Sequence, residues 1–401
     1  MKLRNIAISA LAVTFAMVAC NKQDALPTPA SNDLMTIEIS LENLNFTKAP
    51  TDAFLTDQTK VQLNNFKIFL TDGENLYSAK SLSDVTPVYF YSVASGEALP
   101  KSVTIDLVPS EVTKVVVVGN VDGADWGPDP AADGTFAEKL SDIKSATVAI
   151  ASQQDYKDLI LFDEATLEAS GRIHTTHSDN KTYGVYTADV QLAPLVARFE
   201  LDGFAMTYST TNPKFDNVEV KQVALNKYYS STVLNPLTPS TLVNKIETIT
   251  DKNALDFFAA NLSVTGDEAW YYDANLGVSL PKSAADANGV VKANLADGKK
   301  LSYHFFPATE LPQLFIELAV TPAGETISLP SYIYSKNFKD SAGNDVVFEP
   351  GYVYRMNFQG TANNGDGDIP FNEDNIDQIE KCLEITVDVI PWTVVSIYPE
   401  F

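Results

Sequence analysis

Short segments in which apolar and polar residues alternate, with turn residues between them, recur along the whole chain. Met35, Ile37, Ile39 and Leu41 alternate with polar residues, which is the period of a strand with one buried face. Many short strands joined by turns are typical of β-sandwiches. The sequence therefore predicts a mainly all-β protein.

One segment interrupts this series of strands. Thr135 and Glu138 have the spacing of a capping box, and Phe136, Leu140 and Ile143 fall on one helical face. We therefore expect one or two short helices beside the strands.

The length of 401 residues suggests two domains. An alternating segment at 186–192 leads into Ala193 and Pro194, and strand-like segments resume beyond this proline. We place the boundary at Pro194, which predicts an N-terminal β-sandwich at 49–194 and a C-terminal one at 195–401.

The charge balance excludes some partners. The chain has 52 acidic and 28 basic residues, a net charge of -24, and such a field repels phosphate backbones. We therefore expect no nucleic-acid partner. The two cysteines are Cys20 and Cys382, so we expect burial of the 45% hydrophobic residues, and not disulfides, to stabilise the fold.

The first residues resemble an export signal. Lys2 and Arg4 form a basic region, residues 6–16 are apolar, and small residues precede Cys20. The apolar run is shorter than the roughly twenty residues that a spanning helix needs. We expect residues 1–19 to be a signal peptide and Cys20 to carry lipid. An ordinary signal with a chance cysteine is the alternative.

A polar tether and a first strand follow the signal. Residues 20–48 comprise the tether and the alternating segment that begins at Met35. Lys48 is the only basic residue between Lys22 and Lys60, and the turn-like residues after it suggest an exposed loop. A trypsin-like protease would therefore find one obvious bond, between Lys48 and Ala49.

The last residues, 383–401, also have a strand pattern. Up to Pro391 one face is apolar, and beyond Pro391 both faces carry apolar side chains. Proline cannot donate to a central ladder, so Pro391 is a joint between two pieces or an edge position. The terminal strand either pairs with another molecule or completes its own domain. The residues that would contact a partner are Leu383, Ile385, Val387, Val389, Trp392, Val394, Ile397 and Tyr398.

Signs of catalysis are weak. The chain has three histidines, and none stands beside a cysteine or a carboxylate cluster that would complete a metal or catalytic set. His304, between Tyr303 and Phe305 on an expected strand, is best explained as a partly buried histidine with satisfied hydrogen bonds. We expect no enzymatic activity, no cofactor and no metal site.

Three consecutive aromatic residues, Trp270, Tyr271 and Tyr272, lie in a loop-like stretch. Exposed aromatic rings of this kind can stack on sugars, so they are candidate glycan contacts. Packing of the same loop onto the second sandwich is the alternative.

Several motifs, taken in order, resemble the fimbrillins of Bacteroidetes, the subunits of type V pili. They are the lipobox at Cys20, Lys114-Val-Val-Val-Val-Gly-Asn120 before a short helix, Leu195-Val-Ala-Arg-Phe-Glu-Leu201, Glu349-Pro-Gly-Tyr-Val-Tyr-Arg355, and the terminal strand with Trp392. The resemblance spans nearly the whole chain. It implies two tandem sandwiches of transthyretin-like type.

The resemblance also implies a mechanism of assembly. Such a precursor is lipidated, here at Cys20, carried to the outer membrane, and cut by a trypsin-like protease, here between Lys48 and Ala49. The family usually has arginine at this position. The first strand, with Met35, Ile37, Ile39 and Leu41, would then leave.

The terminal strand of another copy or of a related pilin would fill the groove, which gives a fimbrium at the cell surface. Adhesion to a host or bacterial surface ligand would follow. A monomeric glycan-binding surface lipoprotein, or an adhesive tip pilin, is the alternative function.

Overall fold

The computed structural model describes most of the chain between residues 34 and 397. The described residues are 34–41, 45–47, 60–79, 89–92, 99–123, 126–131, 134–175, 181–261, 269–296, 300–340, 342–356, 358, 371–377 and 382–397. Strands dominate these residues, which confirms the all-β prediction. The helices among them are α2 (Leu140–Lys144), α3 (Asp251–Asn261), α4 (Glu373–Asp377) and the 3-10 turns η2 (Ile150–Gln153), η3 (Ala269–Tyr271) and η4 (Lys282–Ala284).

Helix α2 begins later than the capping-box spacing predicted. Its N-cap is Lys139, whose backbone N–H donates to the Asp142 carboxylate at 2.7 Å, in place of the expected Thr135 and Glu138 pair. Lys139 itself forms a β-bridge with Asn75, and the two residues before it are bends, so the helix begins only at Leu140. Leu140 is buried on the helix as predicted.

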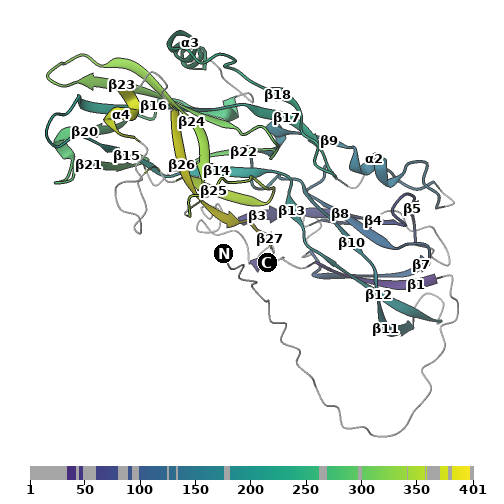
Figure 1. Cartoon of the computed structure of the whole chain (residues 1–401). Helices are drawn as coiled ribbons and strands as arrows, with labels where there is room; N and C mark the ends of the chain where they lie inside the picture. Colours follow the sequence, from purple (N-terminus) through teal and green to yellow (C-terminus); the bar gives the residue numbers. More distant parts are fainter. Residues whose placement is uncertain are drawn as a thin grey trace, which may run out of the picture.

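The N-terminal half is a β-sandwich of two sheets, which lie one above the other in Figure 1. The first sheet has four strands in the order β11-β12-β1-β7 and the second has six, β13-β10-β8-β4-β5 with β6 beside β4. The strands are β1 (Leu34–Leu41), β4 (Asn65–Thr71), β5 (Leu76–Tyr77), β6 (Tyr89–Ser92), β7 (Ser102–Pro109), β8 (Lys114–Gly119), β10 (Leu161–Thr166), β11 (Glu168–Thr175), β12 (Thr182–Val190) and β13 (Ala193–Pro194).

The core between these sheets follows the apolar pattern of the sequence. Val115 and Val118, at the two ends of the run in β8, are fully buried, as are the valines between them. Because successive side chains point to opposite faces of a strand, a continuous apolar run must be packed against other elements on both faces. Leu140 and Ile143 of α2 belong to the same core, so helix and sheet bury one another.

The C-terminal half is built around a nine-stranded sheet in the order β19-β16-β23-β24-β26-β25-β14-β22, with β20 beside β16. Its strands are β14 (Ala197–Leu201), β16 (Phe215–Asn226), β19 (Tyr272–Asp273), β20 (Val278–Pro281), β22 (Leu301–Phe305), β23 (Gln313–Pro322), β24 (Leu329–Lys339), β25 (Tyr352–Met356) and β26 (Cys382–Pro391). A two-stranded sheet of β15 (Gly203–Thr207) and β21 (Val290–Asn294) lies beside it.

Strand β26 joins the two parts of this sheet. Its first half, from Cys382 to Thr386, pairs with β24 in parallel, and its second half, from Val387 to Pro391, pairs with β25 in antiparallel. A strand that changes partner along its length in this way turns a corner between two layers.

An aromatic cluster fills the C-terminal half where β26 turns. The ring of Phe199 lies 4.4 Å from that of Phe305 and 5.2 Å from those of Phe338 and Phe348. Large rings contribute much of the buried apolar area in a core. The corner made by β26 is therefore part of the main packing of this half.

Two small sheets connect the halves. One has the order β18-β17-β9, formed by β18 (Ser240–Val243), β17 (Tyr228–Val233) and β9 (Thr147–Ala149). The other has the order β2-β27-β3, formed by β2 (Asn45–Thr47), β27 (Thr393–Ile397) and β3 (Lys60–Leu63). Strands thus pair across the predicted boundary at Pro194, which stays a prediction.

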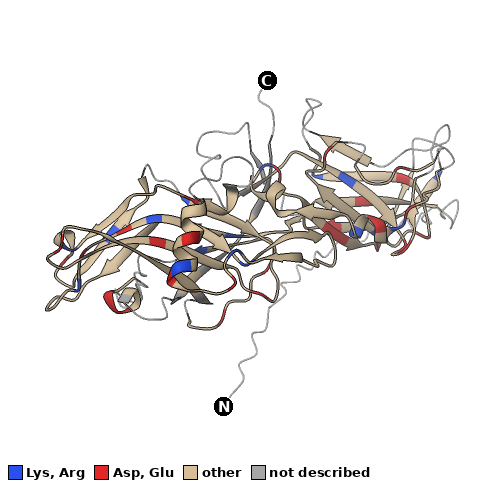
Figure 2. Cartoon of the chain, turned by 90° about the horizontal axis from the view of Figure 1, so that it is seen from above, with Lys and Arg blue, Asp and Glu red and all other residues tan. Residues whose placement is uncertain are grey.

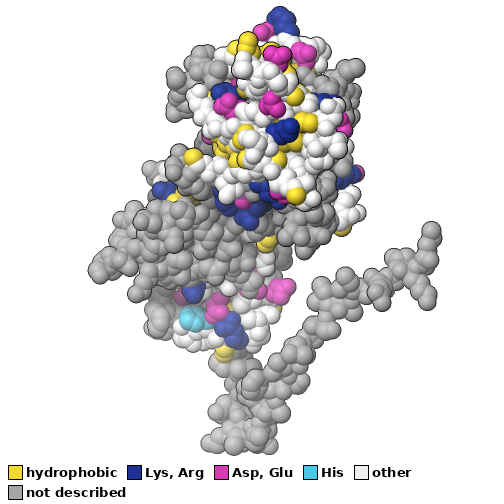
Figure 3. All heavy atoms as spheres, turned by 90° about the vertical axis from the view of Figure 1, so that its left-hand side faces the viewer, with side chains coloured by type: hydrophobic (Ala, Val, Ile, Leu, Met, Phe, Trp, Pro, Cys, Tyr) yellow, Lys and Arg dark blue, Asp and Glu magenta, His cyan; other side chains and the backbone are white. Residues whose placement is uncertain are grey.

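Charges and apolar side chains are mixed on the surface. Figure 2 shows acidic and basic residues distributed over both halves. Figure 3 views the end of the C-terminal half, where apolar side chains lie among charged ones. Three of the four exposed large hydrophobic residues within the described segments are on or near β24 in sequence: Ile327, Leu329 and Val347.

Candidate functional site

Strand β1 is the first strand of the described chain, yet it lies in the middle of its sheet. It pairs in parallel with β12 and in antiparallel with β7. Met35, Ile37, Ile39 and Leu41 are at most 5% exposed, which confirms the predicted buried face. The strand therefore completes the sandwich on which it packs.

The other face of β1 carries polar side chains that contact β7 and β11. Thr36 donates its hydroxyl to the Asp106 carboxylate at 2.9 Å, and the Arg172 guanidinium pairs with Glu38 at 2.5 Å. Exposed ion pairs of this kind contribute little to stability. Burial of the apolar face and the two backbone ladders therefore hold β1 in place.

The slot that β1 occupies has apolar walls. Ile37 lies opposite Ile105 on β7, and Ile39 lies between Val103 on β7 and Ala188 on β12. All of these side chains are buried. Without β1, both neighbouring strands would present unpaired backbone groups and an apolar floor, which is a template for another strand.

The terminal strand β27 lies between β2 and β3. Val395 of β27 pairs with Asn45 of β2 on one side and with Gln62 of β3 on the other, both in parallel. Strand β2 ends at Thr47, one residue before Lys48. The two strands that flank β27 therefore lie on opposite sides of the predicted cleavage point.

The first half of the predicted donor segment is integrated into its own subunit. Ile385 and Val387 are at most 1% exposed within β26, where Leu383 pairs with Ser335 and Val389 with Tyr354. These positions follow the second of the two interpretations of the terminal strand, a strand that completes its own domain. Withdrawal of β26 would break ladders with both β24 and β25.

Trp392 lies between β26, which ends at Pro391, and β27, which begins at Thr393. The residues after Trp392, 393–401, are called the tail below. The Trp392 backbone N–H donates to the Gly351 carbonyl at 2.9 Å. Its indole is 8% exposed and meets the His304 ring edge-on, with centroids 5.3 Å apart. These contacts hold Trp392 against the C-terminal half, immediately before the tail begins.

His304 is more deeply buried than predicted, at 2% exposure, and links the two halves. Its Nδ1 donates to the Gln153 carbonyl at 2.6 Å, and its Nε2 accepts from the Arg198 guanidinium at 3.3 Å. Burial, together with the positive charge of Arg198, lowers the pKa of His304 to about 3. The imidazole therefore stays neutral at physiological pH.

A buried charge cluster lies next to His304 and was missed from the sequence. Glu200 is fully buried and lies 3.1 Å from the Arg355 guanidinium and 3.3 Å from that of Arg198. Burial lowers the pKa of Arg198 to about 10. Arg198 and Glu200 alternate with apolar residues along β14, but all five residues of this strand are buried in the folded chain.

The remaining predicted residues divide into two groups. Val394 and Ile397 lie in β27, where only the backbone pairing is described. Cys20, Lys48, Ala49 and Tyr398 lie outside the described residues. Lipidation and cleavage at these positions stay predictions.

The candidate glycan contacts pack against the protein. Trp270 and Tyr271 meet Tyr228 with ring centroids 4.9 and 6.0 Å apart, and the Lys245 ammonium lies 4.5 Å from the Tyr271 ring. Tyr271 is buried, and Tyr272 is half-buried on β19. This arrangement matches the packing alternative more closely than an exposed sugar-stacking surface.

Two negative findings concern the described residues alone. No group of three or more histidine, cysteine, aspartate or glutamate side chains among them could hold a metal ion. None of the helices resolved in this part of the chain is long and apolar enough to cross a membrane.

No protein-family model and no curated protein matches the chain. Similar solved structures include a candidate cell adhesion protein from Bacteroides eggerthii, with 15% identity and a TM-score of 0.48 over 92% of this chain and 99% of that chain. A candidate cell adhesion protein from Parabacteroides distasonis has 10% identity and a TM-score of 0.49, covering 90% and 98%. The tip fimbrial protein Mfa3 from Porphyromonas gingivalis has 6% identity and a TM-score of 0.38, covering 90% and 100%.

These similar structures are thus described as candidate cell adhesion proteins and a fimbrial tip protein. At identities of 15% or less and TM-scores of 0.49 or less, the similarity assigns no function.

Proposed function

We propose that the chain is a pilus subunit that is lipidated at Cys20, cut after Lys48 and polymerised by strand exchange. The observation that carries the proposal is the position of β1. A strand at the start of the chain fills the centre of a sheet, so one cut can detach it while the rest of the sandwich remains.

The position of Lys48 supports this mechanism. Strands β1 and β2 precede it, and the described chain resumes with β3 at Lys60. After cleavage at this bond, β1 and β2 would be held by non-covalent contacts alone. Their departure would empty the slot between β7 and β12 and remove one of the two neighbours of β27. A single cut would thus open the acceptor groove and loosen the donor tail.

The donor is narrower than the sequence alone predicted. Strand β26 binds both parts of its own sheet, so the segment that exchanges starts after Trp392 and comprises 393–401. Within it, Val395 and Ile397 are two residues apart, the spacing that Ile37 and Ile39 have in β1. The tail therefore carries a pattern that can replace β1.

The energetics favour a stable junction. The four buried side chains of β1 contribute together about 6–12 kcal/mol, at roughly 1.5–3 kcal/mol each. A donor with similar side chains recovers this energy, and the backbone ladders fix its register. Each contact runs from the tail of one molecule to the slot of the next, so it does not close and a filament grows.

The resident strand also explains how the precursor stays monomeric. An empty slot with two unpaired strand edges would aggregate. Strand β1 covers it until the protease acts at the cell surface.

The test is the variant Lys48→Ala, treated with a trypsin-like protease beside wild type. We expect the variant to stay a folded monomer, whereas wild type begins at Ala49 by mass spectrometry and forms high-mass polymers on gels. Lys60→Ala, the next basic residue, is the matched control and should polymerise. Normal filaments from Lys48→Ala would reject Lys48 as the site.

A further inference from the structure

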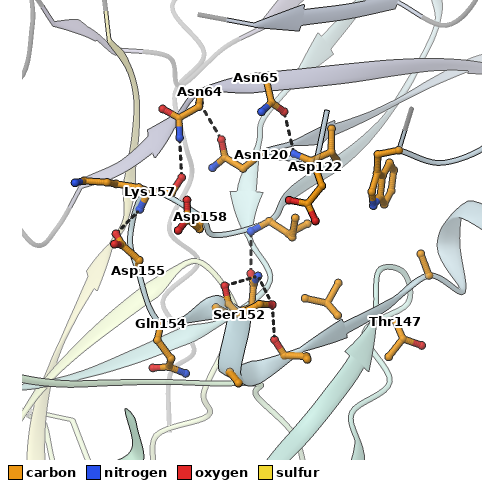
Figure 4. Close-up of a pocket in the computed structure, with 18 residues that line it drawn as sticks. Asn64, Asn65, Asn120, Asp122, Thr147, Ser152, Gln154, Asp155, Lys157 and Asp158 are labelled. Atoms are coloured by element: carbon orange, nitrogen blue, oxygen red, sulfur yellow. Dashed lines mark hydrogen bonds between the residues drawn. The ribbon is translucent and has the colours of Figure 1, made fainter. Parts of the chain in front are cut away.

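A pocket opens near the junction of the two halves and takes no part in the proposed strand exchange. Its volume is about 720 Å³, within the range of roughly 300–1,000 Å³ typical of small-molecule sites. Its wall comes from Asn64 and Asn65 where β3 meets β4, from Asn120, Val121, Asp122 and Trp126 after β8, and from residues between 146 and 160 on and around β9 and η2 (Figure 4).

The pocket wall is held in place by hydrogen bonds. The Asn120 amide donates to the carbonyls of Gln62 and Leu159, both at 2.8 Å, and its oxygen accepts from the Asn64 N–H at 2.8 Å. The Asn65 oxygen accepts from the Val121 N–H at 2.9 Å. Asn120 adopts a φ of 57°, a left-handed conformation that these contacts maintain. The site is therefore pre-organised.

Several polar groups in the pocket are left for a ligand. Within the described segments, the carboxylates of Asp122 and Asp158 and the Nδ2 of Asn65 have no hydrogen-bond partner. Carboxylates accept from hydroxyl groups, and an amide nitrogen donates to them. Partial desolvation and the nearby charges of Asp155 and Asp122 raise the pKa of Asp158, so these carboxylates share one environment.

An aromatic ring lies at the same pocket. Trp126 is half-buried, and its indole packs on the Phe69 ring at a centroid distance of 6.4 Å. Its backbone carbonyl accepts from the Lys67 ammonium at 2.6 Å. The indole is therefore a fixed, partly exposed apolar surface in the same pocket as the Asp122 and Asp158 carboxylates and the Asn65 amide nitrogen.

The charge of the lining narrows the class of ligand. Three aspartates and one lysine, Lys157, give it a net charge of -2, in a chain whose net charge is -24. Such a field disfavours phosphorylated, sulfated or sialylated ligands. A pyranose ring offers hydroxyl groups to carboxylates and amides and an apolar C–H face to an indole.

We propose that this pocket binds an uncharged sugar residue of a surface glycan. The inference goes beyond the proposed pilus function and does not depend on it. In a filament the site would recur in every subunit, and this multivalency would strengthen a weak contact.

The test uses the unprocessed full-length chain and a panel of methyl glycosides of glucose, galactose, mannose, fucose and the N-acetylhexosamines. Sialic acid is the anionic probe and a lysine-rich peptide the cationic one. Binding is measured by saturation-transfer NMR and calorimetry. We expect at least one uncharged glycoside to bind, and sialic acid and the peptide to bind more weakly.

Variants locate the site. Trp126→Ala should weaken binding at least about tenfold, and Asp122→Asn should weaken it severalfold. Asp122 is exposed, and its carboxylate makes no hydrogen bond or ion pair within the described chain, so its replacement leaves the fold intact. Trp270→Ala, which alters the aromatic cluster at Tyr228, is the matched control and should leave binding unchanged.

Three results would overturn the inference. They are failure of every uncharged glycoside to bind, equal binding by wild type and Asp122→Asn, and preferential binding of sialic acid or the lysine-rich peptide. Loss of binding in Trp270→Ala, with Trp126→Ala unaffected, would move the site to the other aromatic cluster and reject this one.

Discussion

Ile37 offers a way to ask whether β1 remains in the assembled fibre. Its side chain is fully buried between the sheets of the N-terminal half. Ile37→Ala should therefore destabilise the unprocessed chain by about 2–5 kcal/mol through lost burial and a residual cavity. For a domain of this size that is a fall in Tm of roughly 5–20 °C.

The same substitution should have no effect on the filament. If β1 has left and the tail of the next subunit fills its slot, the residue at position 37 is no longer present. Filaments assembled from processed Ile37→Ala subunits should dissociate at the same temperature as wild type, as measured by heat-dependent gel migration.

Ile105 is the matched control. It is the register partner of Ile37 on β7 and is 1% exposed, but it belongs to the part that remains after cleavage. Ile105→Ala should lower the stability of both precursor and filament. If Ile37→Ala weakened the filament as much as Ile105→Ala, β1 would still be in place. Ile37→Val, which costs about 0.5–1.5 kcal/mol, serves if the alanine variant fails to fold.

Three further predictions follow from the same geometry. Ser40 and Ser102 are register partners on β1 and β7, so oxidised Ser40→Cys/Ser102→Cys should be cleaved yet form no filaments until a reductant is added, whereas Ser102→Cys alone should polymerise. Removal of residues 393–401 should stop assembly and leave the cooperative melting of the monomer intact, whereas removal of 383–401 should unfold the C-terminal half. Melting followed by circular dichroism tests this, and equal melting curves for the two truncated chains would contradict the role of β26. His304 has a folded pKa of about 3, below its ordinary value of 6.5, so its contribution to stability is complete above pH 6.5 and decreases as the pH falls toward 3. The Tm of wild type should thus fall more steeply between pH 6.5 and 4 than that of His304→Gln, and parallel curves would refute this.

The local pattern was sufficient to predict β1 and its buried face. Four apolar residues with a period of two can bury only one side, and Met35 to Leu41 are buried in that way. The apolar run of β8 is likewise typical of a strand that is covered on both faces. The strand type and the buried face of β1 and β8 depend on residues that are adjacent in sequence, so they can be read from the sequence alone.

The role of β26 could not be predicted from its pattern. The alternation of Leu383 to Val389 is the same whether the strand pairs within its own chain or with another molecule. Its partners, β24 and β25, are set by the tertiary fold. Pro391 did mark the joint at which one strand ends and the next begins.

The charged pair in β14 and the junction pocket were missed for a related reason. Arg198 and Glu200 alternate with apolar residues as a solvent-facing pair would, but other elements cover them. The pocket combines residues near 64, 121 and 155, which no local pattern connects.

The most direct test is the density between β7 and β12 in a cryo-electron microscopy map of the assembled filament. The account predicts that residues 393–401 of the neighbouring subunit occupy this slot and that the chain begins at Ala49. A map in which residues 34–41 still fill the slot, and β27 stays between β2 and β3 of its own subunit, would contradict it.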